Sequence, residues 1–130
     1  MTTARPRTKK SSTPRKLDVA DYARMAVDTA SDRLGSDVAL LDLRSTSDFT
    51  DFFVIASGET DRHLEALAND VESKLRDSGL HLSRREGTGK GGWIVLDFPG
   101  FMVHLFSKSA RSRYGIEKLW ARATEVVRIQ

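Results

Sequence analysis

The feature that most constrains the fold is a pair of strand-like apolar runs, WIVLDF and FMVHLF, separated only by a Pro-Gly dipeptide at 99–100. A two-residue connection of turn-forming residues predicts a tight β-hairpin. With this dipeptide as the turn, Phe98 lies opposite Phe101, and counting outward places Trp93 opposite Phe106. The register of the two strands is therefore predicted from the sequence alone.

Directly opposed residues share a face of the sheet, so this register sorts the hairpin into two faces. One face carries only large apolar side chains and is predicted to be core: Ile94, Leu96, Phe98, Phe101, Val103 and Leu105. The other mixes aromatic, sulfur, imidazole and carboxylate groups: Trp93, Val95, Asp97, Met102, His104 and Phe106. Such a mixture is typical of the centre of a protein interface. If a helix covered this second face, it would instead be ordinary core containing a satisfied polar pair.

Hydrophobic periodicity predicts the other elements and places the hairpin in an α/β protein. One helix is expected from its N-cap at Asp18 to about Arg33, and another over 61–78. Further strands are expected at 38–43, 52–57 and 80–86, and a final helix from about Ser109 through Trp120. The order α-β-β-α-β-β-β-α predicts a mixed five-stranded sheet flanked by helices, in one domain over 17–130.

The positive charge of the chain belongs to its N-terminus. Residues 1–16 contain six of the 21 Lys and Arg residues and none of the 18 Asp and Glu residues, so the rest carries 15 against 18, a formal charge of −3. The tail 1–16 is expected to be disordered, either as a solubilising tail or as an arm that weakly contacts RNA. The mildly acidic body suits a basic partner better than it suits nucleic acid.

Several function classes are disfavoured by what the sequence lacks. There is no cysteine, so disulfides, thiolate metal sites and thiol nucleophiles are excluded. No apolar run approaches the roughly 18 residues of a membrane span, and the basic N-terminus lacks the apolar stretch of a secretory signal. We therefore expect a soluble cytoplasmic protein that makes no membrane contact.

No catalytic or metal site is predicted. Asp97 could orient His104 for general-base catalysis, but no serine or cysteine stands beside the pair. The glycine-rich loop at 87–92 lacks the Gly-Lys-Ser/Thr ending of a phosphate-binding loop and leads into a strand. Glu59 and Asp61 are typical of a helix start, and the histidines lack metal-ligand spacing. The chain is expected to be a binding protein without a cofactor. A residual nucleotide-handling enzyme, with Mg²⁺-dependent nucleotide binding near Glu59 and Asp61, is the alternative.

The segment RSRYGIEKLW near the C-terminus places four side chains along one stripe of a helix: Arg111, Tyr114, Glu117 and Trp120. As a docking helix, this segment would seal the sheet with its aromatic residues while Arg111 pairs with Glu117 or Glu86. Direct contact with a partner is the alternative interpretation.

Together these motifs resemble the ribosomal silencing factor family, the Iojap-like proteins. The residues that carry the resemblance are TDFFVIASG, the following Arg62-His63, Glu86-Gly87, WIVLDF, MVHLF and a final R-x-x-Y-x-x-E-x-L-W, in order over roughly 17–123. One departure is Gly115-Ile116, where the family more often has a bulkier polar residue and Leu. We expect this difference to loosen the last helix without affecting the proposed face.

The resemblance implies an α/β fold related to the minimal nucleotidyltransferases, without catalysis. It further implies binding to the large ribosomal subunit at its intersubunit face, through ribosomal protein number fourteen, which blocks subunit joining and represses translation. An aromatic sheet face without this partner could also pair with a second copy of the chain.

The site residues follow from the same resemblance. Trp93 would be the anchor of the interface, and Asp97 and Glu86 would accept hydrogen bonds from partner Arg or Lys. Met102, His104 and Phe106 would form the surrounding patch. The supporting residues would be Arg111, Tyr114, Glu117 and Trp120.

Overall fold

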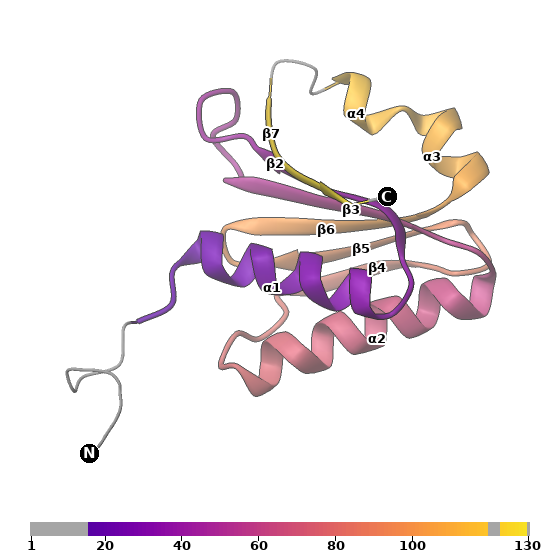
Figure 1. Cartoon of the computed structure of the whole chain (residues 1–130), viewed down its shortest axis with the longest axis horizontal. Helices are drawn as coiled ribbons and strands as arrows, with labels where there is room; N and C mark the ends of the chain where they lie inside the picture. Colours follow the sequence, from indigo (N-terminus) through magenta and orange to yellow (C-terminus); the bar gives the residue numbers. More distant parts are fainter. Residues whose placement is uncertain (1–15, 120–122, 130) are drawn as a thin grey trace.

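The computed structural model describes residues 16–119 and 123–129. Figure 1 shows a twisted sheet with the long helices α1 and α2 on one face and the short helices α3 and α4 on the other. The helices are α1 (Val19–Asp32), α2 (Asp61–Asp77), α3 (Lys108–Tyr114) and α4 (Ile116–Leu119). The predicted α/β class and both long helices are confirmed. Trp120 and the predicted tail, except for Lys16, lie outside the described residues.

The sheet has six strands in the order β4-β5-β6-β3-β2-β7. They are β2 (Ser36–Asp42), β3 (Phe52–Gly58), β4 (Arg84–Thr88), β5 (Trp93–Phe98), β6 (Phe101–Ser107) and β7 (Thr124–Ile129). Neighbouring strands are antiparallel except for β3 and β6, which run parallel. The sheet is mixed, as predicted, but the prediction of five strands is wrong because β7 adds a sixth beside β2.

The C-terminal segment is not one helix. Gly115 adopts the left-handed conformation with φ +58° and ends α3, so the predicted helix is broken there. The chain then forms the short α4 and, after the segment 120–122, returns as β7. The predicted strand over 80–86 also differs, since β4 begins only at Arg84, while Leu80 and Leu82 pack against the core before the strand starts.

The first helix begins as the sequence predicts. The Asp18 side chain accepts a hydrogen bond from the Asp21 backbone N–H, and the Asp21 carboxylate accepts one from the Asp18 N–H, each at 3.0 Å. This reciprocal cap satisfies two backbone donors that would otherwise lack partners.

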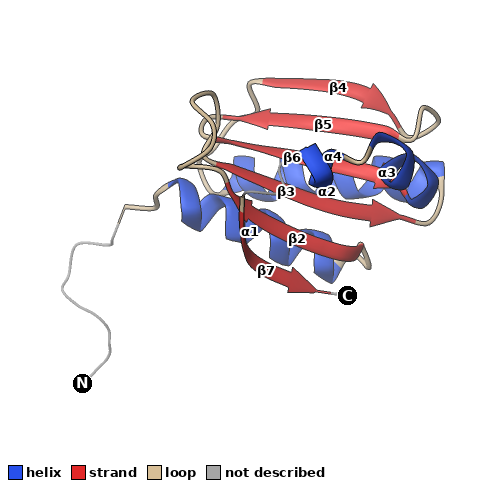
Figure 2. Ribbon diagram, turned by 90° about the horizontal axis from the view of Figure 1, so that it is seen from above, coloured by secondary structure: helices blue, strands red, loops and turns tan. Residues whose placement is uncertain are grey.

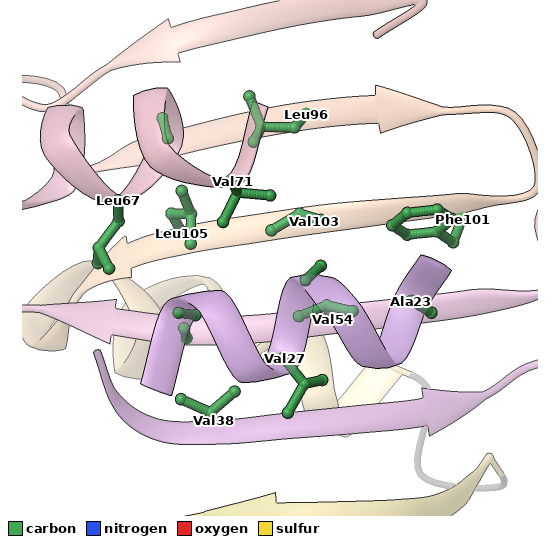
Figure 3. Close-up of a cluster of buried hydrophobic side chains, with 14 of the residues drawn as sticks. Ala23, Val27, Val38, Val54, Leu67, Val71, Leu96, Phe101, Val103 and Leu105 are labelled. Carbon is green, nitrogen blue, oxygen red and sulfur yellow. The ribbon is translucent and has the colours of Figure 1, made fainter. Parts of the chain in front are cut away.

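The main core lies between the sheet and helices α1 and α2. Figure 3 shows Val71 of α2 and Val27 of α1 facing Leu96, Val103 and Val54 of the sheet. The hairpin register is as predicted, with Phe98 opposite Phe101 and Trp93 opposite Phe106, and all six residues predicted for the core face are buried. Within the described part of the chain, no helix is long and apolar enough to cross a membrane.

A second, smaller apolar cluster lies on the opposite face of the sheet, which we call the outer face. Its buried members come from β2, the loop after it, β3, β6, α3 and α4: Leu41, Leu43, Phe53, Ile55, Phe106, Ala110 and Ile116. Trp93 and Met102 pack at its edge, half-buried. The outer face is therefore core at its centre and surface toward β5 and β4.

Candidate functional site

The outer face is only partly covered by helices. Figure 2 shows α3 and α4 over β6 and β3, whereas β5 and the edge strand β4 have no helix in front of them. The core interpretation of the mixed hairpin face therefore holds at His104 and Phe106, which are buried, and the interface interpretation stays a prediction for the rest of that face. The part over β6 is core, and the part over β5 borders solvent.

Trp93 lies at the border between these two parts. Its ring centroid is 4.9 Å from that of Phe106 and 4.8 Å from that of Tyr114, and its indole Nε1–H donates a hydrogen bond to His104 Nδ1 at 3.2 Å. Trp93 therefore contacts two other predicted partner-binding residues, Phe106 and His104 of β6. Tyr114 of α3 packs against the same indole. Two elements, α3 and β6, therefore hold the indole of β5 in place.

His104 is buried, with 4% of its surface exposed, and the Phe53 ring centroid lies 4.5 Å from its own. Burial lowers the pKa of His104 from 6.5 to about 4, so the imidazole is neutral at physiological pH. Because the indole can only donate, Nδ1 must accept and Nε2 carries the proton. Nε2 is buried and has no hydrogen-bond partner among the described residues. His104 therefore bonds to Trp93, and the geometry offers no support for an Asp97–His104 catalytic pair.

The predicted partner-binding residues lie at three depths. Phe106 and His104 are buried, Trp93, Asp97 and Met102 are half-buried, and Glu86 is exposed. With Val95, which sits opposite Glu86 on the same face, the accessible residues form what we call the hairpin patch: Glu86, Trp93, Val95, Asp97 and Met102. A shallow hollow of about 230 Å³ is lined by Glu86, Gly87, Trp93 and Val95.

Sequence reasoning missed two residues, Arg84 beside the patch and Phe49 beside the outer-face cluster. Arg84 lies opposite Asp97 in the β4–β5 pairing, and its Nε is 3.6 Å from Glu86 Oε2, so a cation stands between the two predicted acceptors. Extending the antiparallel register from β5 to β4 would have found it. Phe49, 66% exposed, has its ring centroid 6.4 Å from that of Phe53 and lies in a loop that carries no periodic signal.

The supporting residues Arg111 and Glu117 form an ion pair, which confirms one of the two predicted pairings of Arg111. The Arg111 guanidinium donates to both Glu117 oxygens at 2.8 and 3.0 Å, and Arg128 of β7 donates to the same carboxylate at 3.0 Å. Hydrogen bonding from Arg111, assisted by Arg128, lowers the pKa of Glu117 to about 2. This pair joins α3 to α4, and Arg128 joins both to the sheet, so Tyr114 is held against Trp93.

No metal site accompanies this surface: residues 16–119 and 123–129 contain no group of three His, Asp or Glu side chains placed to hold an ion.

Comparison with known proteins gives a consistent assignment. A family model described as "Ribosomal silencing factor during starvation" matches residues 16–130. A ribosomal silencing factor from Halalkalibacterium halodurans is 30% identical over 106 residues, which cover 82% of this chain and 91% of that protein. The mouse protein named "Mitochondrial assembly of ribosomal large subunit protein 1" is 31% identical over 91 residues, 65% of this chain and 38% of its own length.

The fold is also found among solved structures. A crystal structure of a protein from Chromobacterium violaceum superposes with a TM-score of 0.78 at 28% sequence identity, covering 81% of this chain and 88% of that one. The family model spans all the described elements, β7 included. The chain therefore belongs to the ribosomal silencing factor family.

Proposed function

We propose that this protein binds the large ribosomal subunit at its intersubunit face, through ribosomal protein number fourteen, and so prevents the small subunit from joining. The name of the family and that of the mouse relative support a ribosomal partner and a large-subunit context. A factor that binds the free large subunit but not the joined ribosome shifts the equilibrium toward free subunits by mass action. Repression of translation follows without any catalytic step, in the cytoplasm of the cell.

The observation that carries the site assignment is the uncovered hairpin patch beside a rigid aromatic cluster. Interfaces are typically anchored by large aromatic side chains that are already fixed before binding. Trp93 is such a side chain, because Phe106, Tyr114 and His104 hold its indole on one side while Val95 and the shallow hollow leave the other side accessible. Met102 extends the apolar part of the patch.

The charged rim gives the patch its preference for a basic partner. Glu86 and Asp97 contribute two negative charges and Arg84 one positive charge. The Arg84–Glu86 pair is highly exposed and therefore weak, so a partner Arg or Lys can compete for the carboxylates. His104 and Phe106 would not contact the partner but would fix the Trp93 indole. Arg111 and Glu117 would hold α3 so that Tyr114 packs against the same indole.

Co-sedimentation of the full chain with purified bacterial large subunits, followed by addition of small subunits, tests the proposal. The wild type is expected to travel with the large subunit and to reduce the joined-ribosome peak. Trp93→Ala should abolish both effects. Because this substitution also removes packing, a second variant, Glu86→Gln with Asp97→Asn, changes charge alone at the surface and should weaken binding about tenfold.

The matched control is Asp28→Asn with Asp32→Asn, which removes two exposed carboxylates from α1 on the other side of the sheet. It should bind like the wild type. Wild-type protein that stays at the top of the gradient would refute the function. Binding that survives in both patch variants would refute the site while leaving the function standing.

Three further expectations remain proposals of the same kind. The fold is expected to be related to the minimal nucleotidyltransferases, the free protein could pair through the hairpin patch, and the basic tail could contact RNA weakly. Deleting residues 1–16 should reduce the salt dependence of large-subunit binding if the tail contributes phosphate contacts. Sedimentation equilibrium of the free protein and of Met102→Glu would detect pairing through the patch.

A further inference from the structure

A second concave site lies away from the hairpin patch, where the two parallel strands end. A cavity of about 480 Å³ opens beside the carboxyl ends of β3 and β6 and is lined by Ser36, Asp37, Ser57, Lys108, Arg111, Ser112, Gly115, Glu117 and Lys118. In open α/β sheets, small ligands bind in the crevice at the carboxyl ends of parallel strands. The volume lies within the range of small-molecule pockets.

The floor of the cavity is rigid. Arg111 is 7% exposed, and besides its bonds to Glu117 it donates to the Asp37 carbonyl oxygen at 2.7 Å and to Ser57 Oγ at 3.0 Å. Arg128 pairs with Asp37 and Glu117 from behind. The two acids of the lining are therefore balanced by two guanidinium groups, and the site is formed before any ligand arrives.

The lining groups that are not engaged in these ion pairs are serine hydroxyls and lysine ammonium groups. Ser36 Oγ is buried and has no hydrogen-bond partner among the described residues. Ser57 Oγ accepts from Arg111 and keeps its own proton to donate. Lys118 makes no ion pair with any residue that the structure describes, and the pair of Lys108 with Glu59, at 3.3 Å, is exposed on both sides and thus weak.

We propose that this cavity binds a small, multiply charged phosphate compound. Lys108 and Lys118 at the opening would supply the attraction, and the Ser36, Ser57 and Ser112 hydroxyls would donate to the phosphate oxygens. No aromatic side chain is among the lining residues, so the site offers no ring on which a nucleobase would stack. The ligand is therefore a phosphate compound without a base, and no residue of the hairpin patch lines its cavity.

Isothermal titration calorimetry of the full chain with pyrophosphate, at low ionic strength, tests this inference. The wild type should bind with a dissociation constant below about 1 mM, and Lys108→Gln with Lys118→Gln should weaken binding at least about tenfold. The matched control is Lys74→Gln with Lys90→Gln, which removes the same charge from exposed positions outside the cavity and should bind like the wild type.

Amide NMR shifts locate the bound pyrophosphate independently. The largest shifts are expected at residues 36, 57 and 112, with only small ones in the hairpin patch. The inference is overturned by any of three results: no binding by the wild type, equal weakening in the two double variants, or shifts centred elsewhere. Because all substituted lysines are exposed, loss of the fold would not explain a change in affinity.

Discussion

Replacing His104 with Phe should make the protein less sensitive to mild acid. The imidazole is neutral, buried and hydrogen-bonded through one nitrogen only, with the other left without a partner. A Phe ring fits the same aromatic surroundings, between Phe53 on β3 and Phe106 on β6, and has no nitrogen to leave unpaired. At pH 7 the variant loses the hydrogen bond to Trp93 and gains apolar contact. These two effects on the free energy of unfolding should offset each other to within about 1 kcal/mol.

The size of the acid effect follows from the pKa of His104. In the folded protein burial lowers this pKa to about 4, whereas the unfolded chain retains the ordinary value of 6.5. As the pH falls below 6.5, the unfolded state binds the proton first, so stability is lost between pH 6.5 and 4. Linkage gives a loss of about 2 kcal/mol at pH 5 and only a few tenths at pH 7.

Urea denaturation of wild type and His104→Phe at pH 7 and pH 5 measures this directly. The wild type should lose about 2 kcal/mol more than the variant on going to pH 5. Other titrating groups are common to both proteins and cancel in the difference. An equal loss in the two proteins would refute the reasoning, as would an NMR titration that places the pKa of His104 near 6.5.

Three other substitutions test the supporting structure. Glu117→Gln should destabilise the protein by about 2 kcal/mol at pH 7, less than the Glu117 pKa of about 2 implies, because the side chain is partly exposed. The difference in stability between wild type and variant should vanish as the pH falls from 4.5 toward 2. A difference that stays constant with pH in urea melts would contradict this. Gly87→Ala should lower the stability of the protein by at least about 2 kcal/mol, since Gly87 has φ +87° and a Cβ there would lie 2.0 Å from the Trp93 carbonyl oxygen. An unchanged melting temperature would contradict this prediction. Asp18→Ala should cost about 1 kcal/mol through loss of the helix cap, measured by the same melts, and no loss would mean that the capping box contributes nothing.

The hairpin could be predicted from the sequence because every local signal agreed. The turn dipeptide at 99–100 fixes which residues are opposed, and the alternation of side chains then fixes the two faces. The same reasoning identified Trp93 and Asp97 on the outer face. It could not give their depth, since exposure depends on where α3 crosses the sheet, and that crossing is set by tertiary packing.

The missed strand β7 shows a different limit. Its sequence, TEVVRI, carries β-branched residues, but it follows a helical pattern, and the break at Gly115 is a single residue. Pairing with β2 is a long-range contact that periodicity does not report. The late start of β4 has a similar cause, because Leu80 and Leu82 are apolar for packing rather than for strand pairing.

The position of β7 has a consequence for the synthesis of the chain. β2 lies between β3 and β7, and its central residues, Val38 to Leu41, are all buried. Translation produces β7 after every other strand, so a nascent chain has one edge of β2 unpaired until the last strand emerges. An open apolar edge is a template for pairing with other chains. Truncation ahead of Thr124 should therefore yield a protein that aggregates during expression, even though it keeps the hairpin patch and all buried residues of the main core and loses only the flanking Val127 and Ile129.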